Sequence, residues 1–254
     1  MNKDTKVVIL ENVSFSYNDH EVLKNVNLEV PERDFLALMG PNGGGKTTLI
    51  KICVGLLKPK KGIVKIFGLE PDKVRDKIGY VPQDTNRNKE FPVSVFDVVL
   101  TGRLARKGGL RRSVSPEDIR KVEEILEKMH LSEYRHRRIG ELSGGQRQRV
   151  FIARALVGEP EILFMDEPTA SVDPMFQTEL YELLRQLNEK LTIVVVSHDM
   201  SVLSSYVKSV ACVNGEVFYH GASELTEESI GKIYHCPVEL IAHGVPHRVL
   251  KEHR

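Results

Sequence analysis

Residues 40–48, GPNGGGKTT, combine four glycines with a lysine and two threonines. They contain the pattern G-x-x-x-x-G-K-[ST], between the apolar run DFLALM and the segment TTLIKICVGLL, which has helical spacing. Glycines permit positive φ angles and let phosphate groups approach main-chain N–H donors. A glycine-rich turn with a chance lysine is the alternative. The flanking segments favour a strand, a phosphate-binding loop and a helix.

The side chains of this loop and of a second, acidic segment predict a nucleoside triphosphate and Mg²⁺ as ligands. Lys46 would neutralise phosphate charge, and Thr47 would offer its hydroxyl to Mg²⁺. The apolar run ILFMDE ends in two carboxylates, of which Asp166 would hold Mg²⁺ and Glu167 would polarise the attacking water. Such a pair can also be a solvated strand end. The loop residues predicted to bind the nucleotide are Gly40, Pro41, Asn42, Gly43, Gly44, Gly45, Lys46, Thr47 and Thr48.

Residues 142–146, LSGGQ, predict a second anion-binding helix end. Ser143 and Gln146 have the spacing of a capping box, beside Gly144 and Gly145. An ordinary capped helix is the alternative. With the RQRVFIARAL that follows, the segment resembles the signature motif of ABC-type ATPases, and it lies between the phosphate loop and the acidic strand as it does in that family. The resemblance covers essentially residues 5–222.

Further residues resemble landmarks of the same family, in the same order. Tyr17 resembles the aromatic residue that stacks on adenine, and Gln83 the glutamine that senses Mg²⁺ and the transport channel. Asp173 resembles part of the loop that links two nucleotide sites, and His198 the histidine that contacts the γ-phosphate. Each alone also fits a plainer role, as a core, solvated, capping or structural residue. The resemblance implies that the catalytic residues are Glu167, His198, Lys46 and Gln83, and that the metal-binding residues are Thr47, Gln83 and Asp166.

The alternation of apolar and polar residues over 7–30 predicts antiparallel strands. Apolar runs separated by helices predict a parallel sheet covered on both faces. The resemblance implies an α/β fold of the P-loop NTPase type, with a RecA-like, mostly parallel core, an N-terminal antiparallel β subdomain and an inserted helical subdomain. We expect an ATPase domain over 1–225, its helical subdomain over about 86–160, and a C-terminal extension over 226–254. Further strands are predicted at 34–39, 63–67, 78–81, 161–165 and 191–196, and helices from 47 and at 94–100, 116–130, 146–157 and 176–187.

Composition and charge limit the partners. The chain has 254 residues, 41% of them hydrophobic, and 36 Lys and Arg against 35 Asp and Glu. A net charge of +1 offers no overall field for nucleic acid, which we exclude as a partner. Three unclustered cysteines suit a reducing compartment, and no signal peptide or membrane span is recognisable. We expect a peripheral protein on the cytoplasmic face of the cell membrane.

Every motif occurs once, so the resemblance implies a homodimer in which Ser143 to Gln146 of one chain completes the ATP site of the other. It also implies separate integral membrane permease subunits, with a docking groove over about 90–138, and an extracytoplasmic solute-binding protein. The segment FPVSVFDVVLTGR, residues 91–103, could belong to that groove or be an amphipathic helix packed on its own core.

Gly44 and the amino-acid sequence of residues 91–103 resemble the zinc and manganese uptake branch of this family. The alternatives are an importer for an iron chelate or another solute, a soluble non-transport ABC ATPase and a nonenzymatic regulator.

The C-terminal extension carries possible zinc ligands, although their spacing matches no standard zinc finger: His235, Cys236, His243, His247 and His253. Two basic clusters could face lipid head groups or permease carboxylates, or be solvated: Arg103, Arg106, Lys107, Arg111 and Arg112, and Arg135, Arg137 and Arg138.

Overall fold

The N-terminal region forms a three-stranded antiparallel sheet. The computed structural model describes residues 5–83, 92–106, 113–169, 173–197 and 206–221. The sheet has the order β2-β1-β4, from β1 (Lys6–Tyr17), β2 (His20–Pro31) and β4 (Lys61–Ile66). A tight turn joins β1 to β2 with Asn18 at φ 50°, a left-handed conformation that asparagine tolerates. The hairpin register pairs Tyr17 with His20.

The core sheet has six strands in the order β5-β6-β7-β3-β8-β9. The first five are parallel, and β9 is antiparallel to β8. The carboxyl ends of parallel strands share one edge of a sheet, so the loop after β3 lies on the same edge as the acidic end of β6. The strands are β3 (Phe35–Met39), β5 (Ile78–Val81), β6 (Ile162–Asp166), β7 (Thr192–Val196), β8 (Ser209–Asn214) and β9 (Glu216–Gly221).

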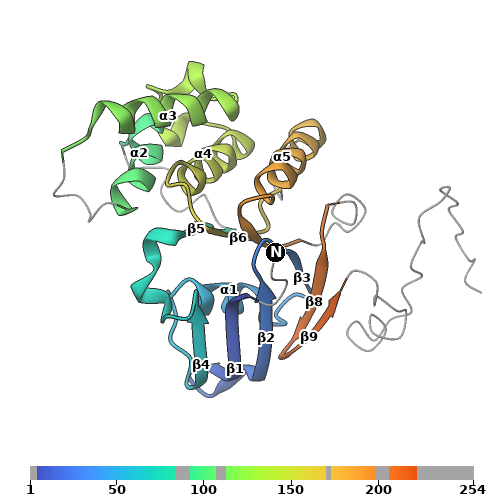
Figure 1. The fold of residues 1–254 in the computed structure, drawn as a ribbon. Helices are drawn as coiled ribbons and strands as arrows, with labels where there is room; N and C mark the ends of the chain where they lie inside the picture. Colours follow the sequence, from blue (N-terminus) through green and yellow to red (C-terminus); the bar gives the residue numbers. More distant parts are fainter. Residues whose placement is uncertain (1–4, 84–91, 107–112, 170–172, 198–205, 222–254) are drawn as a thin grey trace, which may run out of the picture.

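Five α-helices complete the described part of the chain. Figure 1 shows α2, α3 and α4 grouped at one end of the molecule and the antiparallel sheet at the other. Polar side chains cap several helices: Ser115 and Asp118 form a capping box on α3, and Asp173 caps α5. The helices are α1 (Lys46–Cys53), α2 (Val95–Arg106), α3 (Pro116–Lys128), α4 (Gly144–Val157) and α5 (Pro174–Leu187). Single 3₁₀ turns are η1 (Pro71–Lys73), η2 (Arg75–Lys77), η3 (Ser132–Tyr134) and η4 (Ile139–Glu141).

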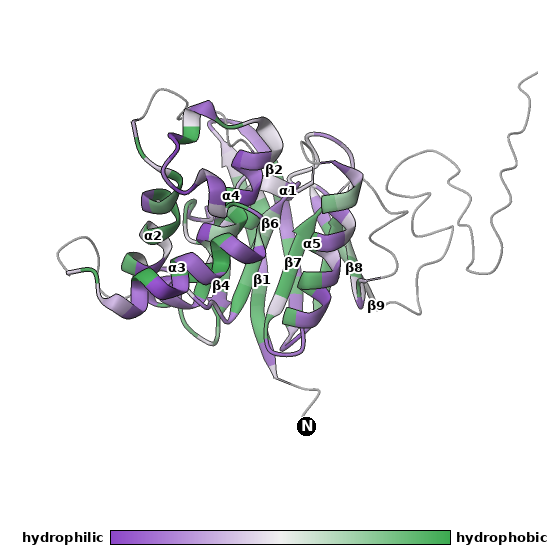
Figure 2. Ribbon diagram, turned by 90° about the horizontal axis from the view of Figure 1, so that it is seen from above, coloured by the Kyte–Doolittle hydropathy of each residue, from purple (hydrophilic) through white to green (hydrophobic). Residues whose placement is uncertain are grey.

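Strand β3 separates two hydrophobic cores. Phe35, Ala37 and Met39 pack in the core that α2, α3, α4 and α5 cover, whereas Leu36 and Leu38 pack in the core that α1 and the antiparallel sheet cover. Because successive side chains of a strand point to opposite faces, a strand covered on both faces reads as a continuous apolar run. Figure 2 shows these hydrophobic strands between helices whose outer faces are hydrophilic.

The predicted fold class is confirmed, and several details differ from the prediction. Helix α2 continues to Arg106, six residues beyond the prediction, and α4 and α5 each begin two residues earlier than predicted. The hairpin of β8 and β9 was missed. The assignment of Arg103 to an exposed basic cluster was wrong, because its side chain is only 3% exposed. Within the described residues, no helix is both long enough and apolar enough to cross a bilayer.

Candidate nucleotide-binding site

The glycine-rich loop turns directly from β3 into α1. Helix α1 begins at Lys46, and Gly45 before it has φ 100°, a left-handed conformation that suits glycine. The Gly44 N–H donates a hydrogen bond to the Pro41 carbonyl at 3.1 Å, and the Gly215 N–H donates one to the Gly44 carbonyl at 3.0 Å. The loop is thus held both by its own main chain and by the turn between β8 and β9.

Two glycines of the loop provide a matched test of this packing. A Cβ at Gly40 (φ +143°) would lie 2.0 Å from the Val213 carbonyl oxygen, whereas a Cβ at Gly43 (φ +81°) would meet nothing within 4 Å. We expect Gly40→Ala to lower the free energy of unfolding by about 3 kcal/mol or more, because overpacking adds to the unfavourable φ. Gly43→Ala should cost about 1 kcal/mol, for its φ alone. Urea denaturation without nucleotide measures both, and equal costs would contradict the packing.

The side chain of Lys46 reaches back to the loop that precedes it in the sequence. Its Nζ donates hydrogen bonds to the carbonyls of Gly40 and Pro41, both at 2.8 Å, and the side chain is buried. Burial lowers the pKa of Lys46, and the negative charges of Glu167 and Asp166 oppose this shift. The ammonium group is therefore placed to meet a phosphate chain beside the N-terminal end of α1, where the helix dipole adds positive potential.

Asp166, the last residue of β6, is a buried carboxylate that lacks a well-formed hydrogen bond among the described residues. The residue is 0% exposed, and neither Oδ1 nor Oδ2 has a hydrogen-bond partner among the described residues. Burial raises its pKa, the charge of Glu167 adds to the rise, and the neighbouring Thr47 hydroxyl opposes it. Two unpaired carboxylate oxygens near a threonine hydroxyl fit a Mg²⁺ ion, whose preferred ligands are oxygens. The residues present therefore fit the predicted metal.

Glu167 follows in a strained backbone conformation. Its φ is 50°, which is uncommon for a residue other than glycine, asparagine or aspartate, and its N–H donates to the Val196 carbonyl of β7 at 3.0 Å. This bond holds the peptide where the chain turns out of the sheet. The side chain lines the pocket described next, so a conformation that costs about 1–3 kcal/mol coincides with the predicted catalytic position.

A pocket of about 500 Å³ brings most of these side chains together. Tyr17 lines the pocket and is 45% exposed, and its ring meets the Phe15 ring edge-on with 4.9 Å between centroids. His20 and Val22 were not predicted as site residues. The turn residues Asn18 and Asp19 could have revealed His20, since a hairpin there places it opposite Tyr17. The lining residues are Tyr17, His20, Val22, Asn42, Gly43, Gly45, Lys46, Thr47, Thr48, Gln83 and Glu167.

The predicted second anion site lies outside this pocket. On α4, the Ser143 hydroxyl accepts a hydrogen bond from the Gln146 N–H at 3.2 Å, and the Gln146 side-chain oxygen accepts one from the Ser143 N–H at 2.9 Å. Asp173 caps α5 and forms an ion pair of 3.1 Å with Arg149; the Phe176 N–H is the main cause of its lowered pKa. Neither Ser143 to Gln146 nor Asp173 lines the pocket of the same chain.

Several predicted residues cannot be placed. His198 lies outside the described residues, as do Ser171, Val172 and the histidines and Cys236 of the C-terminal extension. Among the residues that are described, no group of three or more His, Cys, Asp and Glu side chains forms a metal-binding cluster. The hypothesis of a metal site in the extension stays a prediction.

Together, β3, the glycine loop and α1, with the carboxylates at the end of β6, define a phosphate-loop nucleotide-binding protein. The family model described as ABC transporter matches residues 23–170. This chain belongs to the ABC transporter family, as an ATP-binding and ATP-hydrolysing subunit.

Relatives and solved structures support this assignment. The chain is 40% identical over 223 residues to the zinc uptake system ATP-binding protein ZurA of Listeria monocytogenes, with 86% of each chain covered. It is 40% identical over 230 residues to the manganese transport system ATP-binding protein MntB of Bacillus subtilis, covering 89% of this chain and 92% of that one. The dimeric post-hydrolysis structure of the ATP-binding cassette MJ0796, bound to ADP and Pi, is 32% identical with a TM-score of 0.74, over 85% of this chain and 98% of that one. The predicted resemblance to the zinc and manganese branch is confirmed.

Proposed function

We propose that this chain powers the import of a divalent metal ion, zinc or manganese, through a separate membrane permease. The observation that carries the ATPase part is the convergence of Lys46, Thr47 and Glu167 on one pocket. The buried carboxylate of Asp166, at the position before Glu167, lies close enough to Thr47 and Lys46 for both to affect its pKa. The transported ion is inferred from the names of ZurA and MntB, each 40% identical to this chain.

The residues predicted from the sequence have proposed roles in hydrolysis. The main-chain N–H groups of the loop and the Lys46 ammonium bind the phosphates, and Tyr17 stacks on the adenine. Thr47 and Asp166 would hold Mg²⁺, which supplies positive charge against the phosphate oxygens when bound, and Gln83 would join them. Glu167 accepts a proton from the attacking water, and His198 contacts the γ-phosphate.

A single chain has only half of each complete site. The N-terminal end of α4 lies outside the pocket of its own chain, so a second copy could place these residues on the γ-phosphate: Ser143, Gly144, Gly145 and Gln146. The MJ0796 cassette is dimeric, which supports the same arrangement here. ATP then joins two copies, and hydrolysis separates them. The dimer would work at the cytoplasmic face of the membrane with permease subunits and an extracytoplasmic solute-binding protein.

Metal uptake by cells tests the proposed substrate. A strain that lacks this protein should accumulate radioactive zinc or manganese more slowly than its parent, and the intact gene should restore uptake. A gene encoding Lys46→Ala should fail to restore it at equal protein levels, because phosphate binding loses its cation. If the strain without this protein takes up both metals normally but loses iron-chelate uptake, the transported solute is an iron chelate and not zinc or manganese. Normal uptake of all three would contradict a metal importer.

A further inference from the structure

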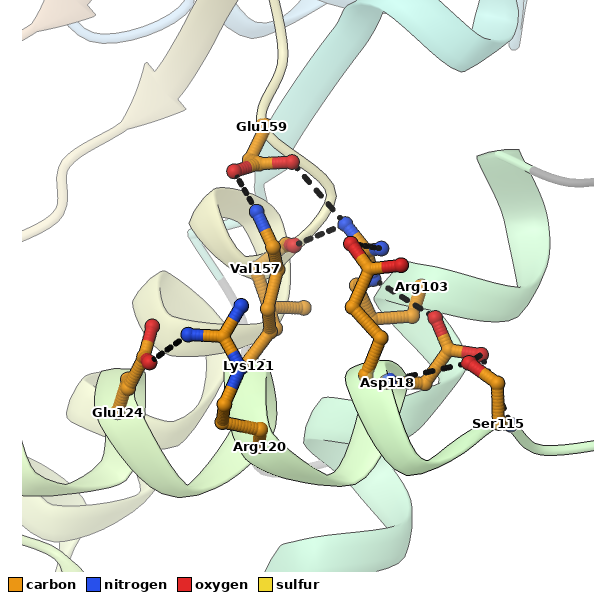
Figure 3. A network of polar contacts seen from close by, with 9 residues as sticks. Arg103, Ser115, Asp118, Arg120, Lys121, Glu124, Val157 and Glu159 are labelled. Carbon is orange, nitrogen blue, oxygen red and sulfur yellow. Dashed lines mark hydrogen bonds and ion pairs between the residues drawn. The ribbon is translucent and has the colours of Figure 1, made fainter.

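A buried arginine joins the three helices α2, α3 and α4. Figure 3 shows Arg103 of α2 between the N-terminal turn of α3 and the C-terminal end of α4. Its Nε lies 3.1 Å from Asp118 Oδ1, and its Nη1 lies 3.4 Å from the Val157 carbonyl oxygen and 3.2 Å from Glu159 Oε2. Arg103 is 3% exposed and Asp118 1%. A planar guanidinium with donors in fixed directions can hold several acceptors at once, which a lysine cannot match.

The backbone brings Arg103 to this position. A Cβ at the preceding residue, Gly102, would lie 2.1 Å from the carbonyl oxygen of Arg154 on α4. Only glycine allows the two helices to approach so closely. The close crossing explains how a side chain of α2 reaches the last carbonyls of α4, so Gly102 and Arg103 act as one structural unit.

Asp118 has two sets of partners. Its Oδ2 accepts hydrogen bonds from the Ser115 N–H at 3.1 Å and from the Ser115 hydroxyl at 2.7 Å, which forms the capping box of α3, while Oδ1 faces Arg103. The carboxylate thus fixes the start of α3 and the position of the guanidinium together. Both charges are desolvated, so loss of Arg103 removes the cation that faces the buried Asp118 carboxylate, whereas Arg103 without Asp118 would keep its ion pair with Glu159.

Glu159 connects this cluster to β6, the strand that ends at Asp166. It lies between the end of α4 at Val157 and the start of β6 at Ile162, with φ at 52°, and its carboxylate binds both Arg103 and Lys121 of α3. Lys121 is the main cause of its lowered pKa, with a contribution from Arg103. The far end of β6 is Asp166, and the far end of α4 is the capped turn at Ser143.

We propose that Arg103 is a positioning residue that fixes α4 relative to β6, and so fixes Ser143 relative to Asp166 and Glu167. The cluster lies at the ends of α4 and β6 opposite to these functional residues, and α4 spans about 21 Å at 1.5 Å per residue. A small rotation at Val157 therefore moves Ser143 appreciably. The inference rests on the proposed function, in which Ser143 must reach the γ-phosphate of the second copy.

This proposal and a purely stabilising role predict different results for ATP binding to one chain after Arg103 is replaced. The pocket for a nucleotide on one chain is formed by the hairpin of β1 and β2, the glycine loop and first turn of α1, Gln83 and Glu167. The hydrogen bonds and ion pairs of Arg103 with described residues go instead to Glu117, Asp118, Val157 and Glu159. We expect binding of ATP to one chain to survive a change at Arg103. Turnover and ATP-dependent dimerisation, which need Ser143 in place, should not.

The experiment uses the full chain with Arg103→Lys, Arg103→Met and Glu159→Gln, and with Arg120→Gln as the matched control. Arg120 pairs with Glu124 on the exposed face of α3, in the same region of Figure 3. The measurements are the melting temperature, the affinity for a fluorescent ATP analogue, kcat and KM for ATP, and ATP-dependent dimerisation by light scattering with Glu167→Gln also present.

Arg103→Lys and Glu159→Gln should lower kcat by about tenfold or more and weaken the dimer, with nucleotide affinity unchanged, because small misplacements of reacting groups are costly. Arg120→Gln should change none of these. A folded Arg103→Lys protein with normal kcat and dimerisation would overturn the proposal, as would equal losses of nucleotide affinity and kcat. If Arg103→Met does not fold, the two milder variants decide. Failure of Glu167→Gln alone to dimerise with ATP would instead refute the proposed function.

Discussion

Replacement of Glu167 by Gln is expected to lower ATP turnover by about 10²–10⁴-fold, the range typical for loss of a general base. The side chain lines the pocket and projects from a backbone held at φ 50° by the bond to the Val196 carbonyl. Glutamine has nearly the same shape, so ATP should still bind. Since ATP joins two copies until it is cleaved, the variant should accumulate as an ATP-dependent dimer.

Phosphate release and light scattering measure the two parts of this prediction. Glu161→Gln is the matched control, because Glu161 precedes the other end of β6, where it pairs with Lys77 at 3.0 Å, away from the pocket. That variant should hydrolyse ATP normally. A Glu167→Gln protein that binds ATP and stays monomeric would contradict the proposed arrangement of two sites between two chains.

Asp166→Asn should stabilise the protein without ligands while it abolishes Mg²⁺-dependent hydrolysis. The wild-type carboxylate is fully buried with neither oxygen hydrogen-bonded among the described residues. Removal of an unsatisfied buried charge should raise the free energy of unfolding by about 1–3 kcal/mol. For a chain of this size, that raises the melting temperature by about 2–4 °C per kcal/mol. Turnover should fall at least about 10²-fold, because the metal loses a ligand.

The pH dependence of this stability gain has a definite sign. Burial raises the pKa of Asp166 in the folded protein, so the ionised carboxylate destabilises the fold above that pKa. The difference in stability between Asp166→Asn and wild type should be full at neutral pH and should vanish as the pH falls through the folded pKa toward the unfolded one. Asp76→Asn, at an exposed residue of η2, is the control and should change neither quantity. A destabilised Asp166→Asn protein, or one with normal Mg²⁺-dependent turnover, would contradict the assignment.

The sequence predicted local features well where a short segment determines its own structure. The loop at residues 40–48 has positive φ angles at three of its four glycines, and Ser143 and Gln146 cap their own helix, so spacing alone sufficed. The hairpin of β8 and β9 also had a local signal, because Asn214-Gly215 between apolar runs is typical of a hairpin turn. It was missed although the pattern was present.

Features that depend on packing could not be predicted. Arg103 belongs to a run of basic residues in the sequence, and only the crossing of α2 with α4 at Gly102 shows that its side chain is buried. In the same way, two adjacent carboxylates at a strand end do not reveal that Asp166 is fully buried, with no well-formed hydrogen bond to the described residues, or that the backbone of Glu167 is strained. These properties arise from partners distant in the chain, such as Val196 and Val157.

The contact between the phosphate loop and the last hairpin has a consequence for how the molecule can be divided. The Gly44 carbonyl accepts a hydrogen bond from the Gly215 N–H, and Gly40 packs against the Val213 carbonyl. Two residues that support the loop, Val213 and Gly215, therefore lie well beyond the family match at 23–170. A fragment that ends before β8 would keep every recognisable motif up to Glu167 and still lack the residues that support the loop. Triphosphate binding therefore requires the assembled domain, and we expect no such fragment to retain it.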